Sequence, residues 1–189
     1  MVGGARQIAA LAALIAAAVV TPAVHSAEVL NVVGTCRGGV PNGMYELRGE
    51  DGRLRVVGAF ASGRKTGTFI FWTSGGARSA VIPYDNDART GTVALWYTDA
   101  RRELARKLEA PYDNNVLHGV LRSYHPNGAP RAEYRFDRGQ LVSAQAWDAR
   151  GTVLPEERAR KLAARDVEAE NRLLAQFDAT VGANLPRCE

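Results

Sequence analysis

Few residues in this chain have the type and spacing that site chemistry requires. Beyond residue 27 the only histidines are His118 and His125, which stand seven positions apart. A metal site built on them would need an acidic third ligand that this spacing does not specify, so turn and surface positions are favoured. Asp85 and Asp87 share a short polar segment, where two carboxylates could bind Ca²⁺ or serve in acid–base catalysis. The segment lacks the ordered ligand spacing of a calcium loop, which favours a solvated turn.

Common catalytic motifs are absent from the sequence. It contains no Gly-x-Ser-x-Gly nucleophile elbow, no Walker phosphate loop and no His-Glu-x-x-His zinc motif. We therefore expect no cofactor, no metal and no catalytic residue. One alternative stays open, a hydrolase that acts on envelope or cell-wall carbohydrate through acids such as Asp85, Asp87 or Glu133.

A basic and aromatic cluster near the end of the chain's central region is the main candidate for a contact surface. Such a cluster suits an acidic partner surface or a glycan phosphate, although exposed arginines often serve solubility alone. A second candidate is a charged loop within residues 99–103, which is lengthened by four residues. The candidate residues are Arg122, Tyr124, Arg131 and Arg135 in the cluster, and Arg101 and Glu103 in the loop.

A repeat positions these residues. Gly43, Gly67, Gly91 and Gly119 are spaced by 24 or 28 residues. An aromatic residue stands at the fifth position after each of the last three glycines, and a second aromatic comes before the next repeat. A fixed period of this size is typical of stacked copies of one small unit. The aromatic residues are Trp72, Trp96 and Tyr124 at the first place, and Phe60, Tyr84, Tyr112 and Phe136 at the second.

Each unit has the composition of a β-hairpin. The segment after each glycine is rich in β-branched and aromatic residues, and a turn sequence follows it. The second strand alternates with period two, which predicts one buried and one open face. The predicted buried set is Val56, Gly58, Phe60, Ala80, Ile82, Tyr84, Leu108, Ala110, Tyr112, Ala132, Tyr134 and Phe136. The open face receives Arg55, Lys107, Glu109, Arg131, Glu133 and Arg135.

Short connections predict consecutive antiparallel pairing, and the count gives nine strands in a meander. Pro83 and Pro111 occupy matching positions and lack a backbone donor, so we expect strand ends or bulges there. Five aromatic residues, three of them from the repeat, could form an exposed strip along the strands. We favour core positions for them, because the covered face needs large side chains to fill it. These residues are Trp72, Trp96, Tyr97, Tyr124 and Trp147.

From Pro155 onward the pattern becomes that of one amphipathic helix, which ends near Gly182. A helix of about 27 residues is ~40 Å long, and nine strands spaced by ~4.8 Å span about 38 Å. A helix laid across the sheet would therefore bring Cys188 beside Cys36. The predicted apolar stripe is Ala159, Ala163, Val167, Glu170, Leu174, Phe177 and Val181.

The two ends of the chain indicate export. Residues 1–27 carry a lone charge at Arg6, an apolar core and small residues near a cleavage site, as a signal peptide does. About thirteen apolar residues fall short of the ~20 of a spanning helix, so a membrane anchor is the weaker alternative. Without Arg6 the chain keeps 23 of its 24 basic residues against 20 acidic ones, and the positive charge is spread along the chain. Nucleic acid is therefore not an expected partner.

An oxidising compartment makes a Cys36–Cys188 disulfide the default, with two unpaired thiols as the alternative. The bridge would close a loop of about 150 residues. In the chain-entropy model this stabilises the fold by at most roughly 4–5 kcal/mol.

Residues 119–139 resemble the variant MORN repeat, which occurs in bacterial envelope proteins and in antitoxin-like proteins. The shared order is Gly, aromatic, Asn-Gly, Glu, aromatic, Gly, and the resemblance covers about residues 43–151. It implies a non-catalytic hairpin scaffold that meets proteins or membrane surfaces. The chain departs from the pattern at Ala100, which replaces a turn glycine, and at 85–87 and 113–115, which replace the usual Asn-Gly-Lys.

These observations predict a mainly β fold with one C-terminal helix, in which a signal peptide (1–27) precedes a MORN-like hairpin sheet (28–154). The amphipathic helix and tail (155–189) pack on one face of the sheet, in the same domain. The predicted function is a periplasmic or secreted, non-catalytic, protein-binding scaffold without a transmembrane segment after cleavage. Its partner would be a toxin or an envelope component, as for an immunity or antitoxin-like protein.

Overall fold

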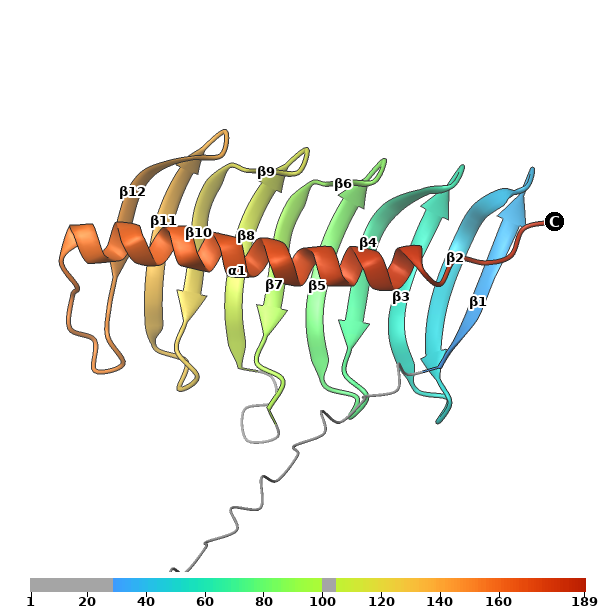
Figure 1. Cartoon of the computed structure of the whole chain (residues 1–189), viewed down its shortest axis with the longest axis horizontal. Coiled ribbons are helices and arrows are strands. Elements are labelled where there is room, and N and C mark those ends of the chain that lie inside the picture. Colours follow the sequence, from blue (N-terminus) through green and yellow to red (C-terminus); the bar gives the residue numbers. More distant parts are fainter. Residues whose placement is uncertain (1–28, 100–104) are drawn as a thin grey trace, which may run out of the picture.

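The computed structural model describes residues 29–99 and 105–189. They form one antiparallel sheet with a helix across one face, which confirms the predicted fold class (Figure 1). The sheet is open, with β1 and β12 at its two edges. The predicted signal peptide, residues 1–27, lies outside the described residues, as do Arg101 and Glu103.

The described residues contain twelve strands in a meander. Ten of them follow in the order β1-β2-β3-β4-β5-β7-β8-β10-β11-β12, while β6 pairs with β5 and β9 pairs with β8. The strands are β1 (Leu30–Arg37), β2 (Val40–Gly49), β3 (Leu54–Ala61), β4 (Arg64–Trp72), β5 (Arg78–Asp85), β6 (Ala88–Arg89), β7 (Gly91–Trp96), β8 (Arg106–Asp113), β9 (Val116–Leu117), β10 (Gly119–Tyr124), β11 (Pro130–Asp137) and β12 (Gln140–Ala146).

The prediction of nine strands missed β1, β6 and β9. The first lies before the first repeat glycine, and the other two are two-residue strands inside predicted connections. Both connections are tight hairpins, because Asn86 and Asp87 have φ of 49° and 68°, and Asn114 and Asn115 have φ of 48° and 69°. Positive φ at both central residues is the geometry of a two-residue hairpin turn, which Asn and Asp tolerate.

The repeat glycines and the two prolines meet at an interruption of the sheet. Gly91 and Gly119 have φ of 113° and 115°, which favours glycine. A Cβ atom at either position would also lie 3.1 or 3.0 Å from the Cγ of Pro83 or Pro111. Pro83 belongs to β5 but has no partner in β7, where pairing is confined to Ala80 and Val81. The predicted irregularity at the prolines is therefore confirmed.

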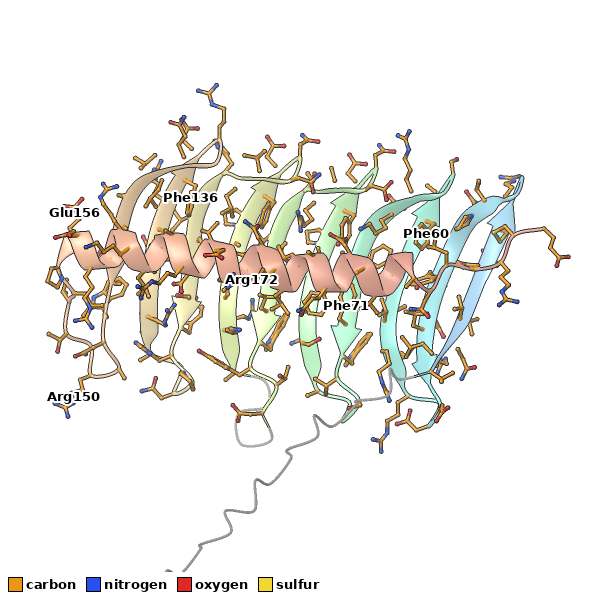
Figure 2. All side chains as sticks on the ribbon, viewed as in Figure 1. Phe60, Phe71, Phe136, Arg150, Glu156 and Arg172 are labelled. Carbon is orange, nitrogen blue, oxygen red and sulfur yellow. A yellow bond between two sulfur atoms is a disulfide. The ribbon has the colours of Figure 1, made fainter. Side chains whose placement is uncertain are left out.

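The core lies between the sheet and the helix. Of the predicted buried set, only Gly58 is partly exposed, and the others are at most 6% exposed. Residues from both the sheet and the helix belong to one hydrophobic cluster. The ring centroids of Phe71 and Phe177 lie 4.5 Å apart across the interface, and Figure 2 shows Phe71 beside the helix.

The helix α1 (Glu156–Gly182) crosses the strands from the β12 end towards β1 (Figure 1). It begins after Pro155, with Glu156 and Glu157 in its first turn, where acidic residues complement the helix dipole. Its buried residues are Ala159, Ala163, Glu170, Leu174 and Val181, which follow the predicted stripe. In the described part of the chain, no helix combines the length and apolar character that crossing a bilayer requires.

The tail after the helix is attached to the first strand. Cys36 and Cys188 form the predicted disulfide, with their Cα atoms 5.6 Å apart. The Tyr45 hydroxyl donates a 2.8 Å hydrogen bond to the Asn184 carbonyl close to this attachment. The prediction that the helix spans the sheet and that a disulfide holds its far end is confirmed.

Candidate functional site

A β-bulge recurs at the same place in each repeat. In each hairpin, one residue of the second strand has no partner in the first strand. This residue stands twelve positions after the repeat glycine, and sixteen positions after it in the lengthened third unit. A bulge turns the extra side chain out of the strand's alternation. The skipped residues are Arg55, Ser79, Lys107 and Arg131.

The bulges correct the predicted positions of three basic residues. Arg55, Lys107 and Arg131 were expected on the open face, but all three lie on the side of the helix. Arg55 is only 6% exposed and its Nη2 lies 3.1 Å from Asp51 Oδ1. Lys107 lines a cavity beside the helix. Arg131 donates to both oxygens of Asp166 on α1, at 2.7 and 2.9 Å.

The aromatic residues at the fifth repeat position lie on the open face. Trp72 and Trp96 directly follow Phe71 and Leu95, which belong to the core, so alternation directs the indoles to the opposite side. Tyr124 and Trp147 follow Ser123 and the core residue Ala146 in the same way. The prediction that these aromatic residues fill the core under the helix is wrong. Tyr97 lies just beyond β7 and lines a cavity beside the helix, which Tyr124 also borders.

Trp96 is buried by basic side chains from both neighbouring strands. The guanidinium carbons of Arg78 on β5 and Arg106 on β8 lie 4.0 and 4.5 Å from the ring centroid. Cation–π contacts of this kind hold the ring and the guanidinium groups in place. Arg106 also contacts Glu109 at 2.5 Å. The open face therefore has an ordered aromatic and basic centre.

Three of the four predicted cluster residues gather beside this centre. Arg122 aligns with Glu109 and Glu133, and its Nε lies 3.3 Å from the Glu133 carboxylate. Arg135, two residues after Glu133 on β11, is exposed on the same face. The Tyr124 hydroxyl lies 3.5 Å from Glu109 Oε2.

A groove of about 540 Å³ adjoins these residues. Tyr124, Pro130 and Trp147 supply most of its apolar lining, and Arg122 and Glu133 bring charges to it. Apolar and aromatic walls with a few charged groups are typical of surfaces that bind proteins or small ligands. We call the surface formed by Trp72, Trp96, Arg122, Tyr124, Arg135 and Trp147 the open-face site.

On the covered face, tyrosine hydroxyls connect the sheet to acidic side chains of the helix. Tyr134 donates to Asp166 at 2.8 Å, Tyr112 to Glu170 at 3.2 Å and Tyr84 to Asp178 at 2.7 Å. Burial is the main cause that raises the pKa of each of these tyrosines, so the hydroxyls stay protonated and continue to donate. Asp178 also pairs with Lys65.

Glu170 is the most buried of these acids, at 4% exposure. Burial raises its pKa to about 7, because an apolar setting disfavours the charged carboxylate, while the Tyr112 hydroxyl and the charge of Arg89 act in the opposite direction. Its Oε2 atom has no hydrogen-bond partner within the described residues. Asp166, one turn earlier, keeps Arg131 protonated by raising the pKa of that guanidinium.

A cavity of about 290 Å³ lies between these acids and the strands β7, β8 and β10. Its apolar walls are Leu95, Leu108 and Leu173. The polar lining consists of Tyr97, Lys107, Ser123, Tyr124, Arg131, Asp166 and Glu170.

Of the other residues with chemical capacity, His118, Asp85 and Asp87 lie apart from both regions, whereas His125 borders the open-face site, with its Nε2 3.0 Å from the Trp147 carbonyl oxygen. His118 is exposed next to β10, and His125 opens the predicted turn, where Gly128 N donates to its carbonyl at 2.8 Å. Asp85 and Asp87 are exposed at a hairpin, and Asp87 Oδ1 accepts from Lys65 N at 2.8 Å. Across residues 29–99 and 105–189, no group of three or more His, Cys, Asp or Glu side chains could hold a metal ion.

Comparison with known protein families and with curated proteins finds no match to this chain. The residues themselves therefore carry the functional argument. Sequence reasoning missed Arg78 and Arg106, which contact Trp96 of the open-face site, and Lys107, Asp166 and Glu170 at the cavity. A signal for Lys107 was present, because it occupies the same repeat position as Arg55 and Arg131.

Proposed function

We propose that this protein is an exported, non-catalytic binding module that docks a partner protein on its open-face site. The observation that carries the proposal is the row of Trp72, Trp96 and Tyr124 with the arginines beside them, on a face that no described element covers. Tryptophan, tyrosine and arginine are the residues most enriched at the centres of protein interfaces. The partner surface would be acidic around an apolar centre, because Arg122 lines the groove and Arg135 is exposed further along β11.

Two observations support export. A disulfide joins Cys36 to Cys188, and such bonds persist mainly in oxidising compartments. The residues before 28 have the composition of a signal peptide. Recovery of the protein from the periplasm or medium, with an N-terminus near residue 27 or 28, would support this part of the proposal. Recovery from the cytoplasm with residue 1 intact would contradict it.

The partner class follows from the MORN-like resemblance of residues 43–151. It favours a scaffold in the envelope, and in its most specific form an immunity or antitoxin-like protein that blocks a toxin. The antiparallel hairpin meander is compatible with that resemblance. Inspection of the neighbouring genes for a toxin is a direct first check.

The experiment is a cross-linked capture from envelope extract with three forms of the protein. The wild type should recover one partner in stoichiometric amount, and the Arg122→Glu/Arg135→Glu variant should lose it. The control is Arg158→Glu/Arg165→Glu, which makes the same change in charge at exposed positions of the helix, over the other face of the sheet. Retention of the partner by the first variant, or its loss from the control, would contradict docking at the open-face site. Hydrolysis of a cell-wall substrate by the purified protein would contradict the non-catalytic part of the proposal.

A further inference from the structure

The bulge positions of the repeats differ in how their charge is compensated. Arg55 forms an ion pair with Asp51, and Arg131 forms a bidentate pair with Asp166. Lys107 occupies the equivalent place in the third repeat, but it has no hydrogen bond or ion pair to any described residue. Instead it lines the 290 Å³ cavity beside α1.

The acidic side chains in the same cavity do not form ion pairs with Lys107. Both Asp166 oxygens are occupied, because Arg131 donates to each and Tyr134 donates to Oδ2. Glu170 is buried and accepts from Tyr112, and burial raises its pKa to about 7, which favours the neutral acid below neutral pH. Lys107, an exposed residue of β8, therefore brings to the cavity a positive charge that no described carboxylate pairs with.

The other residues that line the cavity indicate which chemical group a negatively charged ligand would carry. Leu95, Leu108 and Leu173 form an apolar lining, and Tyr97 adds an aromatic ring. Ser123, which is 4% exposed, is a polar group fixed in the lining by its contact with Arg131. A volume of about 290 Å³ is at the small end of the range for ligand pockets, roughly 300–1,000 Å³.

We propose that this cavity binds a carboxylate carried by a small apolar or aromatic group, with Lys107 Nζ compensating the carboxylate and the leucines contacting the apolar part. In the first and fourth repeats the protein supplies the carboxylate itself. In the third repeat the ligand supplies it. The site lies on the helix side of the sheet and shares Ser123 and Tyr124 with the lining of the open-face groove.

The test is calorimetric titration of the disulfide-bonded full chain with 3-phenylpropionate and with its neutral amide. The acid should bind at least about tenfold more tightly than the amide, because only the acid forms a charge-assisted pair with Lys107. Lys107→Met should reduce binding of the acid to the level of the amide. The matched control Lys161→Met removes an exposed lysine on the helix, which pairs with Glu157, and should leave binding unchanged.

A second variant tests the volume of the cavity rather than its charge. Ala169→Leu places a larger side chain in the lining from an exposed position of α1, so it should weaken the acid and the amide alike while leaving the circular dichroism spectrum unchanged. Equal affinity for acid and amide, unchanged binding in Lys107→Met, or no detectable binding of 3-phenylpropionate would each overturn the proposal.

A carboxylate of this kind has two sources, a free small acid or the C-terminus of a peptide. An acetylated Gly-Gly-Phe tripeptide with a free carboxylate separates them, with its C-terminal amide as the control. Binding comparable to 3-phenylpropionate assigns the site to peptide C-termini. Binding at least about tenfold weaker assigns it to free acids.

Discussion

On the covered face of the sheet, buried tyrosine hydroxyls and Arg131 meet acidic side chains of the helix, whereas on the open face the charges meet one another and solvent. The Asp166–Arg131 pair has side chains that are 17% and 27% exposed, while Arg122 and Glu133 are 50% and 47% exposed. A hydrogen bond to a charged group stabilises more in a dry interface than at the surface. The covered face therefore fixes the position of the helix, and the open face is free to vary for binding.

The same comparison explains why the tyrosines recur along the helix. Apolar packing alone would allow a helix to slide along a row of similar repeats. Tyr134, Tyr112 and Tyr84 each contact a different acid, at 166, 170 and 178, so only one register satisfies all three. The disulfide at the far end adds a covalent limit.

Removal of the disulfide should have the largest effect on the covered side. Cys36→Ser/Cys188→Ser should lower the free energy of unfolding by up to about 4–5 kcal/mol, because the bond joins residues separated by 152 positions. Urea denaturation measures the loss, and the wild type under reducing conditions should match the variant. An unchanged midpoint would show that the non-covalent contacts of α1 suffice to hold it.

Glu170→Gln should stabilise the protein at alkaline pH and leave it unchanged near pH 4. Burial raises the pKa of Glu170 from 4.5 to about 7, so the folded state keeps its proton where the unfolded state loses it. In the wild type, stability from this group is therefore complete below about pH 4.5 and is lost as the pH rises through about 7. At about 1.4 kcal/mol per pH unit, the full loss is about 3 kcal/mol.

The glutamine side chain of this variant would keep an acceptor for Tyr112 without the buried charge. The groups that shift this pKa are Tyr112 and Arg89 from the sheet and Asp166 on the helix, and Lys107 and Arg131 line the same cavity; all of them stay in place in the variant. Urea denaturation of both proteins at pH 4 and pH 8 measures the difference. A variant that is equally destabilised at both pH values would contradict the predicted proton release.

Tyr84→Phe should have a smaller effect. It removes the hydroxyl that donates to Asp178 at 2.7 Å but keeps the ring, and Lys65 continues to pair with the same carboxylate. The expected loss is about 1–2 kcal/mol in the free energy of unfolding. The matched control is Tyr124→Phe on the open face, whose hydroxyl lies 3.5 Å from Glu109 and should matter less. Equal losses at both positions would remove the distinction between the faces.

Much of the fold could be predicted from the sequence because the second strand of each repeat alternates strictly. Val56 and Phe60 or Ile82 and Tyr84 lie on alternating positions of one strand, so one face must be apolar. The helix followed from its stripe of apolar residues, and the disulfide followed from matching lengths. These signals lie within one segment or are sums of element lengths, so they can be used without knowledge of the tertiary structure.

The first strand of each repeat carried less information. Residues 68–72 are almost entirely apolar, so alternation is hidden and Trp72 resembles a core residue. Its side becomes clear only when Phe71 is known to lie in the core, because alternation then directs Trp72 to the other face. The bulges also reversed the predicted side of Arg131, because an extra residue in one strand becomes visible only when its partner strand is known. The cavity at Lys107 depends on that reversal and was beyond sequence reasoning.

The smallest expected effect on the free energy of unfolding is that of the Arg122–Glu133 pair on the open face. Arg122→Gln/Glu133→Gln should change the free energy of unfolding by no more than about 0.5 kcal/mol, because both side chains are half exposed and their pair is screened by solvent. A double-mutant cycle by urea denaturation isolates the coupling between the two residues. Asp166→Asn with Arg131→Gln provides the matched cycle on the covered face and should give a clearly larger coupling. If the two couplings are equal, the open face also contributes to the fold, and variants made there cannot be read as effects on binding alone.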